Sequence, residues 1–316
     1  MKILVTGGAG FIGSATTKRL IAEGHDVVVI DNFNSYYDVQ LKHDRITALI
    51  PNVQVENIDI TDKQALDSLC KKHSFDAVCH FAAQAGVRYS VDVPEVYVTT
   101  NVLGTQTLLE VMKDNGITQM VYASTSSAYG TTTEVPFQET VPADRPVSVY
   151  AATKRAGELL AHSYCEQYGM QVTCLRFFTV YGPWSRPDMA MLKFAQKITA
   201  GDPIDIYNHG DLRRDFTYID DIVNGFVLAL KKPMGYEVIN IGNGSPVQLM
   251  DFIDVLEKNL GVEAKKNMLP MQQGDVYETY ASTSKAHELL GFHPQTDFKE
   301  GVAQFAEWYK EYYSVK

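Results

Sequence analysis

The sequence is poor in cysteine and has no long hydrophobic run. Its four cysteines form neither a CxxC pair nor a metal-ligand spacing, and most lie beside apolar residues, which predicts buried and reduced thiols. The histidines, His80 and His162 among them, also lack ligand spacing, so we expect no metal site. No apolar run is long enough to span a membrane, and the N-terminus lacks the pattern of a signal peptide. We therefore expect a cytoplasmic protein.

Positive charge is also in short supply. The 316 residues include 28 Lys and Arg against 38 Asp and Glu, which gives a formal net charge of −10. Such a charge argues against general affinity for nucleic acid or for an anionic membrane. Any anionic ligand must therefore meet a local group of basic residues. The length allows a large core and more than one domain.

The start of the chain combines two apolar runs with a glycine-rich turn. Residues 3–5 predict one buried strand and residues 27–30 a second. Between them Gly7, Gly10 and Gly13 have the spacing of a dinucleotide-binding fingerprint. In that motif the first glycine permits a tight turn, the second lets the backbone approach the pyrophosphate, and the third allows helix and strand to pack closely. The segment predicts a dinucleotide site at the N-terminus of a helix.

Asp31 follows the second apolar run directly. A carboxylate at this point accepts hydrogen bonds from both hydroxyls of the adenosine ribose, and its charge repels a phosphate at the 2′ position. The residue therefore predicts NAD rather than NADP as the cofactor.

Apolar strand-like runs alternate with amphipathic patterns through the first half of the chain. This alternation is typical of parallel strands joined by crossover helices, and it predicts an α/β doubly wound (Rossmann) fold. We expect an NAD-binding domain at residues 1–179 and a smaller mixed α/β substrate domain at residues 180–316, with segments near 216–241 returning to the first. The further strands expected in the first domain are residues 53–58, 77–81, 120–123 and 172–178.

Two expected helices, residues 95–115 and 150–168, carry apolar residues on more than one face. Burial against the sheet explains one face of each helix. The second face predicts a homodimer in which both helices pack against their symmetry mates. A core helix covered on all sides has the same pattern, so both interpretations stand at this point.

Tyr150 and Lys154 lie four residues apart, which places both side chains on one face of a helix. A tyrosine normally ionises near pH 10, so an adjacent ammonium that lowers the pKa of the phenol makes it a usable base. The ammonium can also bond a cofactor ribose. The hydroxyl-rich stretch 124–127 follows the expected strand 120–123 and completes an acid/base set. The candidate catalytic residues are Tyr150, Lys154 and Thr125.

With these motifs the chain resembles the extended short-chain dehydrogenases/reductases, in the group that modifies nucleotide sugars, over essentially its whole length. The resemblance implies an adenine-contacting pair, a strand end beneath the cofactor, a structural asparagine at Asn101 and an aromatic ring near the nicotinamide. The cofactor-binding residues implied in this way, beyond the three glycines, Asp31, Tyr150 and Lys154, are Phe11, Ile12, Asn32, Asp59, Ile60, Phe81, Ala82, Ala83 and Phe177.

The same resemblance implies a UDP-sugar as the substrate. Arg214 matches the arginine that binds the diphosphate, and Asp275 matches the acid that takes the uridine ribose. The segments 82–90 and 180–189 resemble UDP-glucuronate 4-epimerases, with Ser185 where those enzymes commonly have glycine. The other substrate-binding residues implied are Arg88, Ser126, Ser127, Thr179, Arg186 and Tyr207.

The residues before Tyr129 distinguish the reactions of this group. Its dehydratases resemble one another in carrying an Asp-Glu pair here, and its decarboxylases carry a Glu, whereas this chain has Ser126, Ser127 and Ala128. Epimerisation at C4 is the reaction left, with Thr125 in the position of a catalytic serine.

We expect Arg186 to bind the C6 carboxylate, since a guanidinium binds carboxylates bidentately, and Arg88 is a second candidate. Oxidation of a uronic acid at C4 gives a β-keto acid, which loses carbon dioxide when its carboxylate bond aligns with the ketone π-system. Binding of the carboxylate by Arg186 would hold that bond out of alignment and so prevent decarboxylation.

Three alternatives remain. An epimerase for UDP-glucose/galactose or for N-acetylated sugars would turn over a neutral hexose faster than a uronate. A UDP-glucuronate decarboxylase would release carbon dioxide. A non-catalytic NAD-sensing scaffold would leave the tyrosine, lysine and hydroxyl set without a role.

Overall fold

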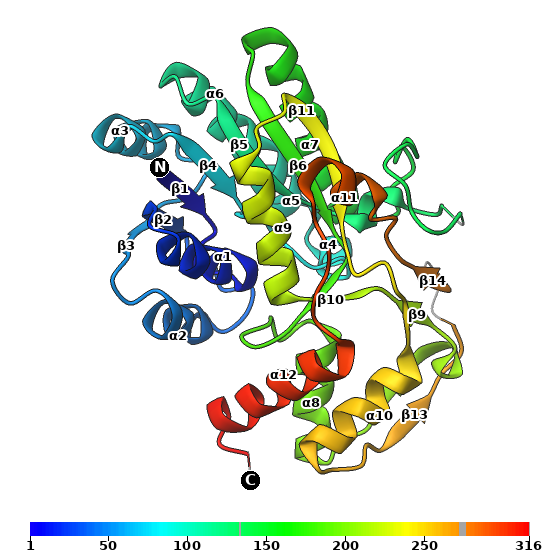
Figure 1. Ribbon diagram of the computed structural model, residues 1–316. Coiled ribbons are helices and arrows are strands. Elements are labelled where there is room, and N and C mark those ends of the chain that lie inside the picture. The colour runs from blue at the N-terminus through cyan, green and yellow to red at the C-terminus, as the bar shows by residue number, and fades with distance from the viewer. Residues whose placement is uncertain (133, 272–275, 316) are drawn as a thin grey trace.

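The computed structural model describes residues 1–132, 134–271 and 276–315, and its centre is a sheet of seven strands (Figure 1). The strand order is β11-β6-β5-β4-β1-β2-β3, and every pairing within this sheet is parallel. The order reverses between β1 and β4, so the expected Rossmann fold is confirmed. The strands are β1 (Lys2–Thr6), β2 (Asp26–Asp31), β3 (Gln54–Asn57), β4 (Ala77–His80), β5 (Gln119–Thr125), β6 (Gln171–Phe177) and β11 (Tyr236–Ile241).

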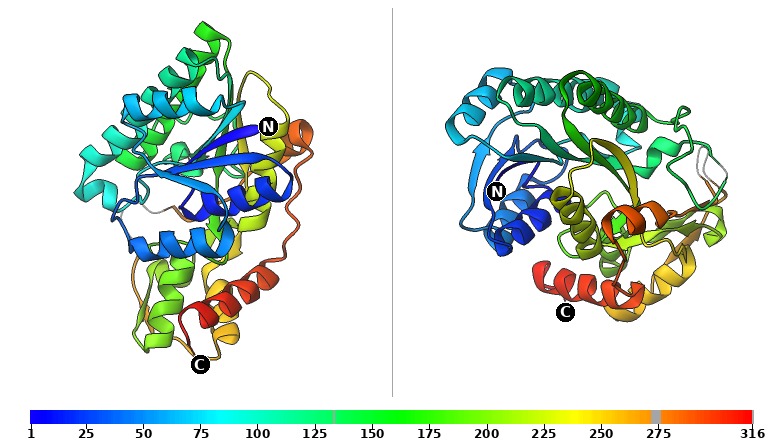
Figure 2. Two further views of the ribbon diagram at one scale, coloured as in Figure 1. Left: turned by 90° about the vertical axis from the view of Figure 1, so that its left-hand side faces the viewer. Right: turned by 45° about the horizontal axis from the view of Figure 1, so that its top comes forward.

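Helices cover both faces of the sheet (Figure 2). On one face α1 (Phe11–Ala22) packs beside α9 (Ile219–Lys231), and on the other α6 (Thr105–Asp114) lies between α3 (Lys63–His73) and α7 (Val149–Tyr168). Successive side chains of β1 enter opposite layers: Ile3 and Val5 pack with the first and Leu4 with the second. A strand buried on both sides needs apolar residues at every position, which is why these strands appear as continuous apolar runs in the sequence.

The two expected long helices differ in regularity. The segment 95–115 runs from α5 (Pro94–Tyr97) through a π-helical stretch, η1 (Val98–Gly104), into α6, so the single regular helix expected there is wrong in detail. The helix expected at 150–168 is α7. The Ser148 hydroxyl caps its first turn by accepting a hydrogen bond from the Ala151 amide at 3.1 Å, and Gly169 ends it with a φ of +65°.

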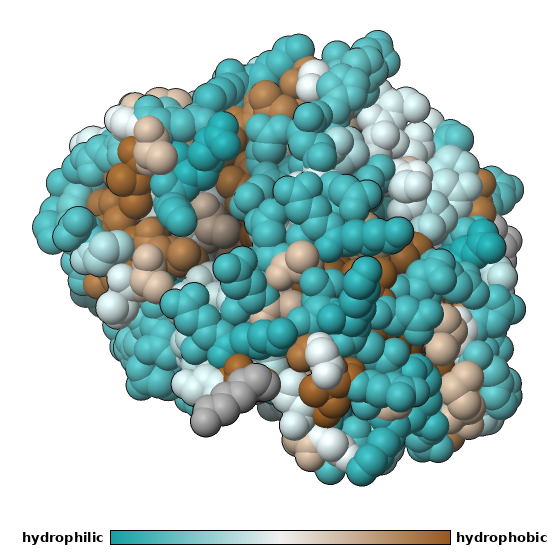
Figure 3. Space-filling view, turned by 60° about the horizontal axis from the view of Figure 1, so that its bottom comes forward, coloured by the Kyte–Doolittle hydropathy of each residue, from teal (hydrophilic) through white to brown (hydrophobic). Residues whose placement is uncertain are grey.

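The later part of the chain forms a second group of elements below the sheet in Figure 1. In it α10 (Leu249–Leu260) packs between α8 (Ala190–Ala200) and α12 (Phe298–Tyr312). The face that Figure 3 presents is mostly hydrophilic, because these helices turn their apolar sides inward. The short strands are β7 (Thr179–Tyr181), β8 (Ile204–Ile206), β9 (Arg213–Arg214), β10 (Phe216–Tyr218), β12 (Val247–Gln248), β13 (Lys266–Met268) and β14 (Glu278–Thr279).

Two segments from the second half of the chain contact the first half. The strand β11 forms an edge of the central sheet, and α9 packs on α1. The division into domains at residue 179 stays a prediction. The remaining elements are α2 (Val39–Leu49), α4 (Tyr89–Asp92), α11 (Ser284–Leu290), and the 3₁₀ turns η2 (Ser126–Tyr129) and η3 (Tyr207–Gly210).

At two positions of the glycine loop a side chain would collide with backbone atoms. A Cβ on Gly13 would lie 2.3 Å from the Gly7 carbonyl oxygen, and a Cβ on Gly7, whose φ is +68°, would lie 2.6 Å from the Ala82 amide nitrogen. Gly10 differs, since the nearest atom to a Cβ there is the Gly7 carbonyl oxygen at 3.0 Å. Gly13 is therefore required for the backbone to pack in this way. Gly10 is required instead by a ligand that approaches the loop from the cleft.

We expect Gly13→Ala to destabilise the cofactor-free protein by about 1–3 kcal/mol, because the new methyl overpacks against the backbone. Gly10→Ala should change the melting temperature of the cofactor-free protein much less and still abolish cofactor retention. Thermal unfolding and the absorbance of bound nucleotide in the purified protein measure the two effects. Equal loss of stability in both variants would contradict this assignment.

Candidate active site

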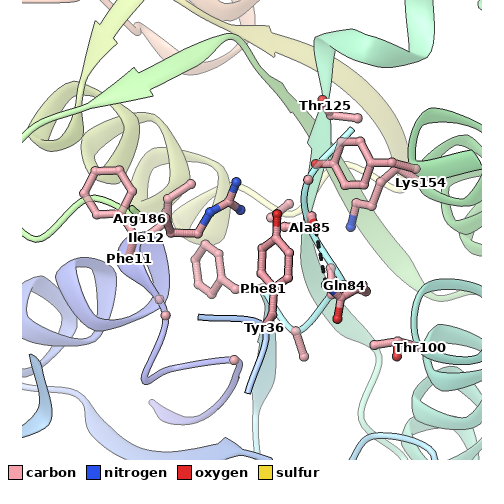
Figure 4. A pocket seen from close by; sticks show the side chains of 18 of the residues that line it. Phe11, Ile12, Tyr36, Phe81, Gln84, Ala85, Thr100, Thr125, Lys154 and Arg186 are labelled. Atoms are coloured by element: carbon pink, nitrogen blue, oxygen red, sulfur yellow. Dashed lines mark hydrogen bonds between the residues drawn. The ribbon is translucent and has the colours of Figure 1, made fainter. Parts of the chain in front are cut away.

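A deep cleft opens at the carboxyl ends of the strands, where the order reverses between β1 and β4 (Figure 4). Doubly wound sheets bind their ligands at this switch point. The N-terminus of α1 faces the cleft through the glycine loop, and Gly10 is its N-cap without a side chain to occupy the free amides. An anionic group is favoured in front of such a helix end.

Most of the residues expected to bind cofactor line this one cleft, although they come from segments spread over almost the first 180 residues. Asp59 is the exception, because its carboxylate accepts hydrogen bonds from Asn32 and Thr61. Burial alone would raise the pKa of Asp59, but these bonds outweigh it and hold the pKa below its usual value. The lining residues that were expected are Gly7, Gly10, Phe11, Ile12, Gly13, Asp31, Asn32, Ile60, Phe81, Ala82, Ala83, Tyr150, Lys154 and Phe177.

Asp31 is held in place by three groups. Its carboxylate accepts hydrogen bonds from the amides of Ala9 at 3.2 Å and Phe33 at 2.9 Å, and the Lys42 ammonium lies 3.3 Å away. The side chains of Asp31 and Lys42 are both almost fully buried. Sequence reasoning missed Lys42, because ten residues of loop and helix lie between it and Asp31. The carboxylate is therefore pre-oriented at the end of β2, where an adenosine ribose would lie.

Tyr150, Lys154 and Thr125 come together as a set. Tyr150 lies in the first turn of α7 and Lys154 one turn later, while Thr125 ends β5 beside them; Figure 4 shows Lys154 and Thr125 on the same side of the cleft. The Thr125 hydroxyl also accepts a hydrogen bond from the Ser127 amide at 3.1 Å, which begins the η2 turn. The Lys154 ammonium lies 4.0 Å from the centre of the Tyr122 ring, a cation–π contact.

Burial shifts the pKa of both members of the tyrosine–lysine pair. It lowers the pKa of Lys154 to about 7, against an opposing effect of the Glu158 carboxylate. It raises the pKa of Tyr150, and the Arg186 charge and a hydrogen bond with Thr125 work in the other direction. In the ligand-free protein the groups that favour the tyrosinate are thus Arg186 and Thr125.

A buried ion pair lies behind Lys154, one turn further along α7. Glu158 accepts bonds from Arg176 at 2.9 and 2.7 Å and from the Ser124 hydroxyl at 2.5 Å. Burial alone would raise the pKa of Glu158, but Arg176 and Ser124 hold it below its usual value. The carboxylate therefore stays ionised next to the lysine. Nothing in the local sequence pattern of Glu158 or Arg176 indicated this pair.

Arg186 points into the centre of the cleft in Figure 4. Its Nε and Nη2 atoms donate to the two carboxylate oxygens of Asp188, each at 3.0 Å, and the Tyr36 hydroxyl donates to the same carboxylate at 3.1 Å. The guanidinium thus binds one carboxylate through two parallel N–H bonds, the bidentate geometry typical of arginine–carboxylate pairs. The hydroxyl residues expected around it, Ser126, Ser127 and Thr179, line the same cleft.

A second cleft adjoins the first and shares Tyr36, Gly86, Val87, Thr179 and Asp188 with it. Besides Thr179, three residues expected to bind substrate line it: Arg88, Tyr207 and Arg214. The Arg88 guanidinium lies 5.5 Å from the centre of the Tyr207 ring. Lys193 and Lys197 of α8 add positive charge that sequence reasoning missed. The prediction for Asp275 lies outside the described residues.

Asn101 connects the cleft floor to α7. It accepts a bond from the Gln84 amide at 2.7 Å and donates to the Gln84 carbonyl at 3.0 Å and the Thr153 hydroxyl at 3.1 Å. It lies in the π-helical stretch η1, which also brings Thr100 to the cleft. Irregular turns of this type commonly occur at functional sites. The three hydrogen bonds of Asn101 therefore connect the segment after β4 to α7.

Comparison with known proteins identifies the family. Residues 3–242 match the model of the NAD dependent epimerase/dehydratase family. The UDP-glucuronate 4-epimerase of Thermodesulfobacterium geofontis is 45% identical over 98% of this chain and 96% of that protein. The chain belongs to the NAD dependent epimerase/dehydratase family.

Two solved structures show the same fold over nearly the whole chain. The UDP-glucuronic acid 4-epimerase of Bacillus cereus, crystallised with UDP-glucuronic acid and NAD, is 38% identical with a TM-score of 0.92, over 99% of this chain and 100% of that one. The UDP-glucose 4-epimerase of Thermotoga maritima, with UDP-glucose, is 32% identical with a TM-score of 0.91, over 99% and 100%. NAD is the cofactor of this protein, and the open glycine loop and the fixed Asp31 fit it.

The burial of Lys154 predicts that its effect on the stability of the protein depends on pH. Because the folded pKa of Lys154 lies below the ordinary 10.5, the unfolded chain binds the proton more tightly. Burial of the charged lysine therefore lowers the free energy of unfolding. This loss of stability is complete below the folded pKa and disappears as the pH rises through 10.5. We expect Lys154→Met to lose activity by at least about 100-fold and to raise the melting temperature of the NAD-free protein at pH 6, with a smaller gain at pH 10.

Thermal unfolding at the two pH values measures this effect. Lys258→Met, on the exposed side of α10, serves as the control and should show no pH-dependent gain. A stability change in Lys154→Met that is independent of pH would contradict the assignment.

Proposed function

We propose that this protein catalyses the NAD-dependent C4 epimerisation of UDP-glucuronate to UDP-galacturonate. The observation that carries the proposal is the Arg186 guanidinium, which lies in the cleft that also holds Tyr150, Lys154 and Thr125 and already binds a carboxylate there. The cationic second cleft suits the diphosphate of the substrate. The relatives and the Bacillus cereus structure support the same substrate.

Each member of the set has a role at the C4 hydroxyl. Tyr150 takes the hydroxyl proton, Thr125 donates a hydrogen bond to the oxygen, and Lys154 binds the cofactor ribose. Arg186 and Thr125 favour the tyrosinate. Bound NAD supplies the acceptor for the C4 hydride and returns the hydride to the sugar. The 4-keto sugar turns about its diphosphate between the two transfers, so the hydride returns to the opposite face of C4, and Tyr150 returns the proton to the C4 oxygen. Since NAD is regenerated in each turnover, we expect it to remain bound.

The carboxylate requires its own restraint, because oxidation at C4 makes the substrate a β-keto acid. Such an acid loses carbon dioxide when its carboxylate bond aligns with the ketone π-system. We assign Arg186 and the hydroxyls of Ser126, Ser127 and Thr179 to holding that bond out of alignment. The absence of a carboxylic acid at positions 126–128 fits this assignment, since dehydratases and decarboxylases of the family carry one there.

We also propose a homodimer. Val98 and Leu103 of η1 and Leu159 of α7 are each about half exposed, and the two elements pack side by side. Apolar side chains gathered on adjacent helices commonly mark an interface. This face is the one that the sequence pattern of the two long helices predicted.

A cytoplasmic location completes the proposal. Among the described residues, no helix has the length and apolarity needed to cross a membrane. All four cysteines are free, as suits a reducing compartment.

The substrate is tested with the purified protein and no added NAD. We expect UDP-glucuronate to be converted to UDP-galacturonate, and UDP-glucose to turn over more slowly or not at all, with products identified by NMR. Tyr150→Phe should lower kcat by about 100-fold or more because the proton acceptor is lost. Turnover of the neutral sugar alone would make the protein a hexose epimerase, and release of carbon dioxide would make it a decarboxylase.

The dimer is tested by sedimentation of Leu103→Glu and Leu159→Glu. Buried charges at the interface should shift the protein to the monomer mass. Val262→Glu changes an exposed apolar residue just after α10 and should leave the mass unchanged. A wild-type protein that sediments as a monomer would contradict the proposal.

A further inference from the structure

Arg45 of α2 is a cation buried completely outside the two clefts. Its guanidinium has no carboxylate within salt-bridge distance among the residues that the structure describes, although burying a charge without such a partner is costly. Its partners are instead backbone carbonyls and one hydroxyl. Arginine is suited to such a position, because its planar group directs five N–H bonds in fixed directions.

The guanidinium joins segments that are far apart in the sequence. Nη1 donates to the Ala9 carbonyl at 3.3 Å and to the Tyr37 hydroxyl at 2.7 Å. Nε donates to the Trp184 carbonyl at 3.0 Å, and Nη2 to the Ser185 carbonyl at 3.2 Å. Ala9 belongs to the glycine loop, directly before Gly10, and Ser185 directly precedes Arg186. One side chain thus connects the loop in front of NAD to the segment that carries Arg186.

The second segment needs this support, because its backbone is strained. Trp184 has a φ of +65°, which is unfavourable for a residue with a bulky side chain. Its indole packs against α12, with ring centres 5.4 Å from Trp308 and 5.0 Å from Tyr312. Tyr312 in turn donates a hydrogen bond to Asp44, the neighbour of Arg45. The strained turn is therefore fixed on its side-chain face by α12 and at its carbonyls by Arg45.

From this geometry we infer that Arg45 is a positioning residue that couples the NAD-binding loop to the orientation of Arg186, and so to recognition of the substrate carboxylate. The inference rests on the proposed function, in which Arg186 binds that carboxylate. Arg45 lines neither cleft, so its effect must pass through the backbone of residues 9 and 184–185 and through Tyr37, whose side chain lines the first cleft. A lysine keeps the charge but cannot reach these three carbonyls in the fixed directions of a guanidinium.

Coupling of this kind is reciprocal. If Arg45 connects the two loops, bound UDP-glucuronate should slow the loss of NAD from the wild-type protein. Without the guanidinium this protection should be reduced, while NAD should still bind through the glycine loop and Asp31.

The test uses the holoenzyme and two ligands, UDP-glucuronate and UDP, by titration calorimetry. UDP lacks the sugar, so its affinity should not depend on Arg186. For Arg45→Lys we expect the affinity for UDP-glucuronate to fall about tenfold, the effect of one charge-assisted hydrogen bond, and that for UDP to change less than about twofold. Arg19→Lys, an exposed arginine of α1 paired with Glu23, is the matched control and should change neither.

Arg186→Ala separates failure of the inference from failure of the proposed function. If Arg186→Ala weakens UDP-glucuronate and leaves UDP unchanged, the carboxylate assignment holds, and Arg45→Lys in that background should then cause little further loss. If Arg186→Ala changes neither the affinity nor the product ratio, the carboxylate assignment is wrong.

Two results would overturn the role of Arg45 while the carboxylate assignment stands. One is equal weakening of UDP and UDP-glucuronate together with a lower melting temperature, which is the pattern of a merely structural residue. The other is full additivity of Arg45→Lys with Arg186→Ala. Unchanged protection of NAD by UDP-glucuronate in Arg45→Lys would contradict the coupling itself.

Discussion

The close packing of the glycine loop against the ends of β1 and β4 is the constraint on which the site depends. Because Gly7 and Gly13 have no side chains, α1 approaches the sheet closely and its N-terminus faces the cleft. That approach fixes where a dinucleotide phosphate can lie. Asp31 and Lys154 line the same cleft, and in the function that we propose they align the cofactor.

Charged side chains around this cleft are arranged in pairs of opposite charge. Glu158 and Arg176 neutralise each other behind Lys154, Lys42 balances Asp31, and Asp188 occupies Arg186 in the ligand-free protein. In each of these three pairs the partner fixes the direction of the charge, which is the condition for catalysis by pre-oriented groups. Arg45 departs from this rule, since backbone carbonyls replace the carboxylate, and its four bonds give it a connecting role between the two loops.

Much of the fold was predictable, because strands buried on both faces leave continuous apolar runs that period and length identify. The strand expected at 172–178 and observed as Gln171–Phe177 is an example. The π-helical turn at Val98–Gly104 was not predictable, since no residue pattern specifies that hydrogen-bond shift and tertiary contacts select it. The same holds for Lys42 and for the Glu158–Arg176 pair, whose partners lie on other elements of the fold. It holds as well for Lys193, which only the fold brings to the second cleft.

The sequence by itself determined the local motifs: the glycine spacing, the acid after β2, the Tyr150–Lys154 pair and the hydroxyls at the end of β5. These are short-range patterns, so backbone geometry and helical period suffice to interpret them. Only the tertiary structure decided that Arg186 shares a cleft with Tyr150, that Asp188 binds Arg186, and that Arg45 joins residues 9 and 185. The physical reason is that these contacts form between segments far apart along the chain, and packing of the whole fold sets their distances.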